Sequence, residues 1–323
     1  MVLRRILFLV MLGLGVKLTP AAAVERTFKQ NFELPPGGTV TVDTYRGGIL
    51  IEEAEGRQVR TEVRVELATE DEDEAAKAIE ALKLDVSATG NEVRLRARNP
   101  RESRALFAWE EKKRIELTFR IAVPKGATVV LATLDGSVTV GNLTGNVDAR
   151  TRAGRIFCRK IDGSIKATVD TGEIVISRCT GTTEATVQTG TIRAGTLFGA
   201  TKLRIDSGDI EVLSALGGIE AKAAAGDVSV GLQKGFLGET KIEADGGNVV
   251  LQIEPTVPMN LQASATWGRV ATTMPFAVSA GGPGKRSLSG TLNGGGPRVR
   301  VHASGGHVSL VSHQLFFDLA EGS

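Results

Sequence analysis

Five carboxylates in the centre of the chain recur beside glycines at intervals of eighteen or thirty-six residues. They are Asp170, Glu173, Asp206, Asp209 and Asp227. Paired carboxylates can act as general acid and base in the cleavage of a glycan, and carboxylate oxygens also bind Ca²⁺. However, Gln188 and Thr191 interrupt the series, and the Gly-Gly-x-Gly-x-Asp signature of calcium-binding nonapeptide coils is absent. We therefore expect a solvated face of mixed charge, with calcium binding and catalysis as less favoured alternatives.

The three histidines form a second candidate group, because all of them lie near the end of the chain. They are His302, His307 and His313. His302 and His307 flank one expected turn and should both point outward, so a metal site can be drawn between them. No acidic residue or cysteine is close to them in the sequence. Surface histidines are therefore the better interpretation.

Aromatic rings that could stack on a sugar are few. Besides phenylalanine, the chain has only Tyr45, Trp109 and Trp267. Trp109 could stack on a sugar or pack at the start of a strand, and the scarcity of rings disfavours a carbohydrate-processing enzyme. No Ser/His/Asp set, phosphate-binding loop or zinc-ligand spacing is found in the sequence. We assign no catalytic residue, cofactor-binding residue or metal ligand, and expect no cofactor.

The five carboxylates lie in a repeat in the middle of the chain, which must position them. Glycines recur there every nine residues, and apolar residues follow them at every second position. The glycines are Gly136, Gly145, Gly154, Gly163, Gly172, Gly181, Gly190, Gly199, Gly208, Gly217, Gly226 and Gly235. The alternation indicates strands with one buried face, and recurrence every eighteen residues indicates stacked coils. We predict an all-β fold: a single-stranded β-helix, or β-solenoid, with about eighteen residues and two strands per coil and glycines at the corners.

Both cysteines fall within this repeat. Cys158 and Cys179 occupy neighbouring inward-facing columns of successive coils. A disulfide needs Cα atoms within about 7 Å of each other, and the offset between the two columns disfavours this. Because no histidine or acid neighbours either residue, we expect two buried free thiols, with a bridge as the alternative.

The chain is predicted to have four parts. Residues 1–23 have the basic start, short apolar run and small-residue cleavage site of a secretory signal peptide. The other parts are 24–133, the first coils with a short helix inserted between Thr69 and Leu84; 134–252, the regular solenoid; and 253–323, irregular final coils and a C-terminal cap that includes Phe316 and Phe317. Within the last part, Val299 to Leu310 are expected to restate the pattern as the final coil.

The charge balance restricts the classes of partner. Removal of residues 1–23 leaves 39 − 3 = 36 basic residues against 37 acidic ones, a net charge of −1. This balance favours neither nucleic acid nor an anionic membrane surface. The apolar run of the signal is too short to span a bilayer. No transmembrane segment is expected in the chain that remains after cleavage. We expect export to the periplasm, the outer cell surface or the medium.

Several sequence phrases, in a fixed order, resemble a known family. They are Pro-Gly-Gly-Thr-Val-Thr-Val, a helix between strands, Val-Pro-Lys-Gly-Ala, Thr-Gly-Glu-Ile-Val-Ile, Ser-Gly-Asp-Ile-Glu-Val, and Gly-Gly-Gly-Pro-Arg-Val-Arg-Val-His-Ala-Ser-Gly-Gly-His-Val-Ser-Leu. Together they resemble the bacterial β-strand-repeat domains labelled "putative adhesins", over nearly the whole chain after residue 23. The resemblance implies a β-helix in the cell envelope and no known catalytic residues. One departure is Trp267-Gly268-Arg269-Val270, where the family more often has small polar residues before the glycine. Trp267 is therefore either a contact for a partner or a packing residue.

Two functions from different classes remain open. The leading hypothesis is a non-enzymatic, adhesin-like envelope protein that serves as a binding or scaffold surface for an unknown protein or glycan. The alternative is a β-helical polysaccharide-active enzyme, which requires a groove with two of the carboxylates about 5–10 Å apart. A periplasmic assembly or sensing component would differ from the first only in location and partner. The sequence leaves the oligomeric state undetermined.

Overall fold

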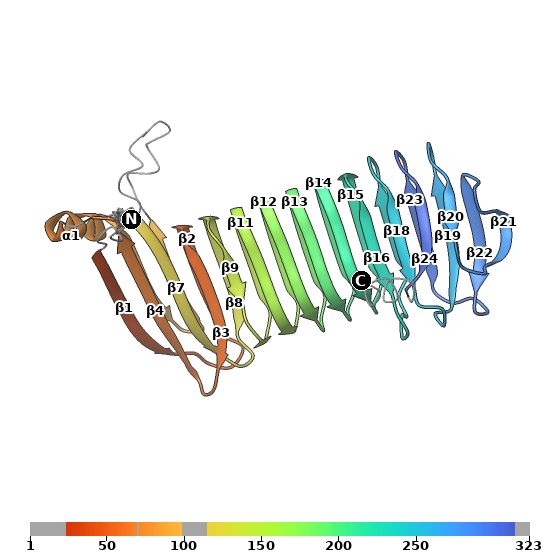
Figure 1. Ribbon diagram of the computed structural model, residues 1–323. Helices are drawn as coiled ribbons and strands as arrows, with labels where there is room; N and C mark the ends of the chain where they lie inside the picture. Colours follow the sequence, from red (N-terminus) through yellow and green to blue (C-terminus); the bar gives the residue numbers. More distant parts are fainter. Residues whose placement is uncertain (1–23, 70, 99–114, 314–323) are drawn as a thin grey trace, which may run out of the picture.

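The computed structural model describes residues 24–69, 71–98 and 115–313. The described chain is all-β apart from one short helix, as predicted, and its strands stack along one axis into a solenoid-like rod. Figure 1 shows α1 at one end of the rod and β21 at the other. The predicted signal peptide, Trp109 and the tail with Phe316 and Phe317 lie outside the described residues.

The middle of the rod consists of four long parallel strands. They are β11 (Val147–Asp162), β12 (Ile165–Cys179), β13 (Thr183–Leu197) and β14 (Thr201–Ala215). Neighbouring strands pair residues that are eighteen apart, as in Ile156 opposite Ile174 and Ile174 opposite Ile192. These side chains are fully buried, and each contributes about 1.5–3 kcal/mol. Stacked apolar columns therefore hold the rod together.

Each of these strands runs without interruption through a glycine corner, so the two strands expected per coil form one bent strand. Gly172 and Gly190 lie at such corners with φ of +140° and +143°, and they are paired with each other. A Cβ on Gly190 would lie far inside van der Waals contact with the carbonyl oxygen of Gly172. The repeating glycines are thus required by the close stacking of corners as well as by their backbone conformation.

At the N-terminal end, the order of strands in space differs from their order in the chain. β2 (Thr39–Arg46) and β3 (Gly48–Ala54) pair in parallel with β8 (Thr128–Asp135) and β9 (Val138–Val140). The described strands between them in sequence lie on the outer side of this coil. β6 (Glu92–Arg98) pairs with β2, and β7 (Ile115–Pro124) pairs with β3.

The outermost strands at this end are antiparallel. β4 (Gln58–Leu67) pairs with β7, β1 (Val24–Glu33) pairs with β4, and β5 (Lys83–Thr89) pairs with β6. β5, which begins two residues after the helix, was not predicted from the sequence. The helix, α1 (Glu72–Ala81), lies between β4 and β5, and its N-terminus is capped by Asp71, whose Oδ1 accepts from Asp73 N at 2.9 Å. Leu82, directly after the helix, is buried in the core.

The C-terminal end shows the same kind of exchange. β15 (Ile219–Ala225) and β16 (Val228–Leu232) are followed by β17 (Thr240–Ala244) and β18 (Val249–Ile253). The next strands in space are the last in the chain, β23 (Arg298–Ala303) and β24 (Val308–Ser312). Beyond them lie β19 (Met259–Ala265) and β20 (Val270–Thr272), then β22 (Ser287–Leu292) and β21 (Ala277–Gly281). The segment expected to be the final coil is therefore enclosed between two others. The short β10 (Leu143–Thr144) pairs with β11.

Candidate functional site

The five carboxylates are surface residues, and three of them have clear structural partners. Glu173 forms ion pairs with Arg193 and, at 3.2 Å, with Arg155. The Asp209 carboxylate accepts a hydrogen bond from Asp227 N at 2.8 Å, and the Asp227 carboxylate accepts one from Asn248 N at 2.7 Å. Each aspartate thus binds the backbone of the next coil just after a glycine corner.

This series continues to the C-terminal end of the rod. Asn248 Oδ1 accepts from His307 N at 2.9 Å, and His307 Nδ1 accepts from Arg269 N at 3.2 Å. We name this series, Asp209, Asp227, Asn248 and His307, the corner ladder. Its polar side chains satisfy backbone N–H groups where the strands bend, and each of the four stands directly after a glycine of this corner. Sequence reasoning did not identify this role, although the fixed position after the glycine carries the signal.

Neither chemistry considered for the carboxylates has a matching arrangement in the part of the chain that the structure describes. No group of three or more histidine, cysteine, aspartate or glutamate side chains there could hold a metal ion. Four surface hollows are described, and none is lined by any of the five carboxylates. Asp170 is half-buried and Asp206 is exposed on the outer face of the rod.

Both cysteines are buried free thiols, as predicted. Burial raises the pKa of the Cys158 thiol from 9.0 to about 12, with a smaller contribution from Cys179 nearby. Burial also raises the pKa of Cys179, whose Sγ donates to the carbonyl oxygen of Gly163 at 3.2 Å. A thiol held in its protonated form is a poor nucleophile and a poor metal ligand. The two residues therefore serve as core packing groups.

This burial predicts a specific loss of stability at alkaline pH. The Cys158 thiol ionises near pH 9 in the unfolded chain and near pH 12 in the folded one, so the folded state binds more protons between these values. The free energy of unfolding should fall by up to about 1.4 kcal/mol per pH unit above pH 9. Urea unfolding of wild type and Cys158→Ala between pH 8 and pH 11 tests this. The stability difference between them should narrow as the pH rises, and parallel curves would contradict the prediction.

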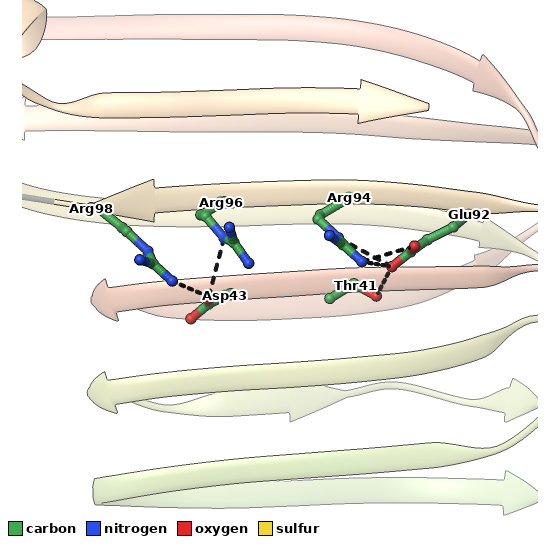
Figure 2. Close-up of polar contacts among 6 residues, drawn as sticks. All are labelled: Thr41, Asp43, Glu92, Arg94, Arg96 and Arg98. Carbon is green, nitrogen blue, oxygen red and sulfur yellow. Dashed lines mark hydrogen bonds and ion pairs between the residues drawn. The ribbon is translucent and has the colours of Figure 1, made fainter. Parts of the chain in front are cut away.

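Each arginine of a row on β6 forms an ion pair with an acidic neighbour. Figure 2 shows Arg94, Arg96 and Arg98 along the strand, facing β2. Asp43 on β2 lies 3.3 Å from Arg96 and 3.5 Å from Arg98. Glu92 accepts from Thr41 Oγ1 at 2.8 Å and from Arg94 at 3.0 Å, and these hydrogen bonds lower the pKa of Glu92. The row is therefore a network of charge pairs and does not offer free cations to a polyanion.

The exposed side chain that stands out chemically is Trp267, in the turn between β19 and β20. It is 80% exposed, so of the two interpretations of this residue the structure excludes packing in the core. Trp267 N donates to the carbonyl oxygen of Ser304 at 3.1 Å, and Gly305 and Gly246 lie at successive positions along the same corner. The Trp267 backbone is thus held at a regular corner, and the residues at the same position of the next two coils are glycines.

Hydroxyl and imidazole groups lie immediately beside this tryptophan. His302 on β23 places Nδ1 at 2.9 Å from Ser264 Oγ, and its Nε2 lies 3.2 Å from Ser304 Oγ and 3.4 Å from Thr266 Oγ1. We call Ser264, Thr266, Trp267, His302 and Ser304 the Trp267 corner. Both nitrogens of the imidazole contact hydroxyls and neither contacts a carboxylate, so the acid–histidine–nucleophile arrangement of a hydrolase is not formed.

Two residues of the Trp267 corner, Ser264 and His302, line a shallow hollow of about 290 Å³ that Trp267 itself does not line. Its lining includes Glu243, Gln262, Ser264, Ser289, Arg300 and His302. Of the other histidines, His307 belongs to the corner ladder, and His313 Nε2 lies 3.4 Å from Gln233 Nε2. The three histidines therefore have separate neighbours, as expected for surface residues. The corner combines a flat apolar ring with hydrogen-bond donors and acceptors, the composition of a recognition surface.

Sequence reasoning missed the other exposed large apolar side chains. Among them are Phe198, Leu213 and Leu237, which is 84% exposed. Phe198 is covered on one side by Arg178, whose guanidinium carbon lies 4.7 Å from the ring centroid. Leu213 could have been found, because it stands at an outward position of an alternating strand. Phe198 and Leu237 lie in turns, where the periodicity gives no direction.

These features define an all-β, solenoid-like protein with one short helix. Residues 182–311 match the family described as "Toastrack DUF4097". The predicted resemblance to the family of adhesin-like repeat domains is thereby confirmed for this part of the chain. In the described residues, no helix is both long enough and apolar enough to cross a membrane.

Solved structures are similar at low sequence identity. One is a putative adhesin from Bacteroides fragilis, at 9% identity, with 89% of this chain and 97% of that chain covered and a TM-score of 0.33. A putative adhesin from Parabacteroides merdae has 8% identity, coverage of 88% and 96%, and a TM-score of 0.29. A putative lipid binding protein from Parabacteroides distasonis has 11% identity with the same coverage and TM-score. Similarity at this level assigns no activity to the chain. No curated protein matches it.

Proposed function

We propose that this protein is a non-enzymatic, exported envelope protein, adhesin-like in architecture, whose rod presents the Trp267 corner to a protein or glycan partner. The proposal includes export by the signal-peptide-like residues 1–23. It also takes the register of eighteen residues in the middle of the rod to be one coil of a solenoid. A rod of stacked coils holds a surface group at a fixed distance from either end, which suits a scaffold or binding role.

The observation that carries the proposal is the exposure of Trp267. A tryptophan buries on the order of 200 Å² when it is covered, and apolar burial contributes about 25 cal/mol per Å². Covering the exposed part of this ring is therefore worth roughly 4 kcal/mol, which the isolated rod does not gain. Aromatic residues of this kind, set among polar groups on a rigid element, are typical energetic centres of binding surfaces.

The substitution Trp267→Ala tests this function. Fluorescently labelled wild type and variant are titrated onto immobilised polysaccharide and protein fractions of the source cell envelope. We expect Trp267→Ala to weaken binding to one of these fractions at least tenfold, because the main apolar contact is lost, while the melting temperature is unchanged. Leu237→Ala is the matched control, because Leu237 is equally exposed and lies outside the Trp267 corner. Equal binding by wild type and both variants would contradict the proposal.

Location is tested separately by protease treatment of intact cells. If the chain is digested while a periplasmic control survives, it is displayed on the outer surface. If it is protected and fractionates with the periplasm, the partner belongs to that compartment. Recovery of the full chain with residues 1–23 attached, in the cytosolic fraction, would contradict export.

A further inference from the structure

The edge strands at the two ends of the rod differ in how well they are protected against pairing with other strands. A sheet that does not close on itself leaves a row of unpaired backbone N–H and C=O groups on each outermost strand, and such edges pair readily with other strands. Among the described strands, β1 and β5 are the outermost at the N-terminal end, each with one pairing partner. Within the same described residues, β21 is outermost at the other end and pairs with β22 alone.

The N-terminal edge is protected by charge and by the helix. β1 includes Glu25, Arg26, Lys29 and Glu33 among its ten residues. Arg26 forms an ion pair of 3.4 Å with Glu72, at the start of α1. Charged side chains on an edge strand are a common device against unwanted strand pairing, because an incoming strand would have to desolvate them.

The C-terminal edge lacks this protection. β21 is Ala277–Gly281, and all five of its residues are exposed, with Val278 at 46%. No charged residue occurs anywhere between Arg269 and Lys285, in a chain that is 24% charged. In the part of the chain that the structure describes, the protection of β21 is geometric: a register shift at Ser279, whose Oγ donates to the carbonyl oxygen of Ser289 at 3.1 Å, and the flanking Pro275 and Pro283. These features shorten the edge without closing it.

We propose that β21 is a self-association surface, at which the β21 strands of two copies of this chain pair antiparallel about a twofold axis. In such a pairing both strands have the same sequence, and residues near the twofold axis lie close to their own counterparts in the other copy. A charged residue there would lie close to a like charge, which would destabilise the pair. An uncharged strand of small residues is the composition that suits this geometry. The twofold operation uses the same edge on both copies, so it closes as a dimer, whereas pairing of β21 with β1 would produce an open filament.

The dimer should be weak and limited in extent. Pro275 and Pro283 confine the paired segment to about five residues, since proline cannot donate to a strand ladder. The association joins two rods end to end at their C-terminal ends, which leaves both N-terminal ends free. This inference does not depend on the function proposed for the Trp267 corner, although a dimer would carry two such corners.

Sedimentation velocity of the mature chain, from a few micromolar to several hundred micromolar, tests the proposal. We expect a monomer that converts to a dimer as concentration rises. Ala280→Lys should raise the dimer dissociation constant at least tenfold, because it places two lysines on the same face of the paired strands, close to the twofold axis. Leu237→Lys adds the same charge at an exposed site far from β21 and should leave association unchanged.

A second variant, Ala277→Lys, places the added charge at the other end of β21. The melting temperature of each variant shows whether the fold is retained, so a loss of association can be distinguished from a folding defect. The proposal is overturned if the wild type stays monomeric over the whole range. It is also overturned if both lysine variants in β21 associate like wild type, or if the mass grows beyond two copies.

Discussion

Replacing Gly190 by alanine should lower the free energy of unfolding by more than about 3 kcal/mol and reduce the yield of folded protein. Two separate costs combine at this position. The backbone has φ of +143°, a conformation that L-residues with a Cβ rarely adopt. The added Cβ would also collide with the carbonyl oxygen of Gly172 on the preceding coil. Because both atoms belong to backbone in a packed stack, the corner would have to open, and hydrogen bonds of the β12–β13 ladder would be lost.

Gly126→Ala separates the two costs. Gly126 has φ of +83°, and a Cβ there would meet no atom within 4 Å. Its replacement should cost only the conformational term, about 1–2 kcal/mol. The comparison is made by urea unfolding followed by circular dichroism, with midpoints compared because a stack of repeats need not unfold in one step. If Gly190→Ala and Gly126→Ala shift the midpoint equally, close stacking of the corners contributes nothing to stability.

The repetitive middle of the rod was predictable because its determinants are local. Residues two apart in a strand face the same side, and residues eighteen apart lie on neighbouring strands, so a period in the sequence becomes a column in the core. Ile156, Ile174 and Ile192 illustrate this, since all three are buried and paired as the spacing indicated. The burial of Cys158 and Cys179 followed from the same columns.

The ends could not be predicted in this way, because the columns are interchangeable. Val40 pairs with Val129, although 88 residues separate them in the chain, and Val299 pairs on one side with Leu261 and on the other with Thr240. Coils with inward-facing aliphatic residues can stack on one another in more than one order, so the sequence pattern does not predict which two coils are neighbours. The order at both ends is decided by connections that are long enough to reach past a neighbour.

The candidate site was predictable only as a set of residues. Trp267 was recognised as unusual for its type, but neither its exposure nor the glycines at the same corner of the next two coils, Gly305 and Gly246, could be predicted from the sequence pattern. Asp209 and Asp227 were weighed as possible acid–base or calcium groups. Their role as acceptors for the backbone of the next coil is a relation in three dimensions that no single strand reveals.

The exchange of order at the C-terminal end leads to the second large expected effect. A chain that ends at residue 297 lacks β23 and β24, which lie between β17–β18 and β19–β20. We expect β19 to β22 to lose ordered structure completely, because β19 then loses its parallel partner and its buried Leu261 and Ala263 lose the coil that covers them. Amide hydrogen exchange should become at least a hundredfold faster throughout β19, β21 and β22.

A chain that ends at residue 254 is the matched control. It removes more residues, yet all strands up to β16 keep their pairing partners. β17 and β18 then form the open end of the rod. Interactions in a stack of coils are with nearest neighbours, so β11 to β14 should keep their exchange protection in both truncated chains. The shorter chain should therefore be the better ordered of the two, with less protease-sensitive material. If β19 to β22 remain protected in the chain that ends at residue 297, they form an independent unit, and the last strands of the chain do not hold the cap in place.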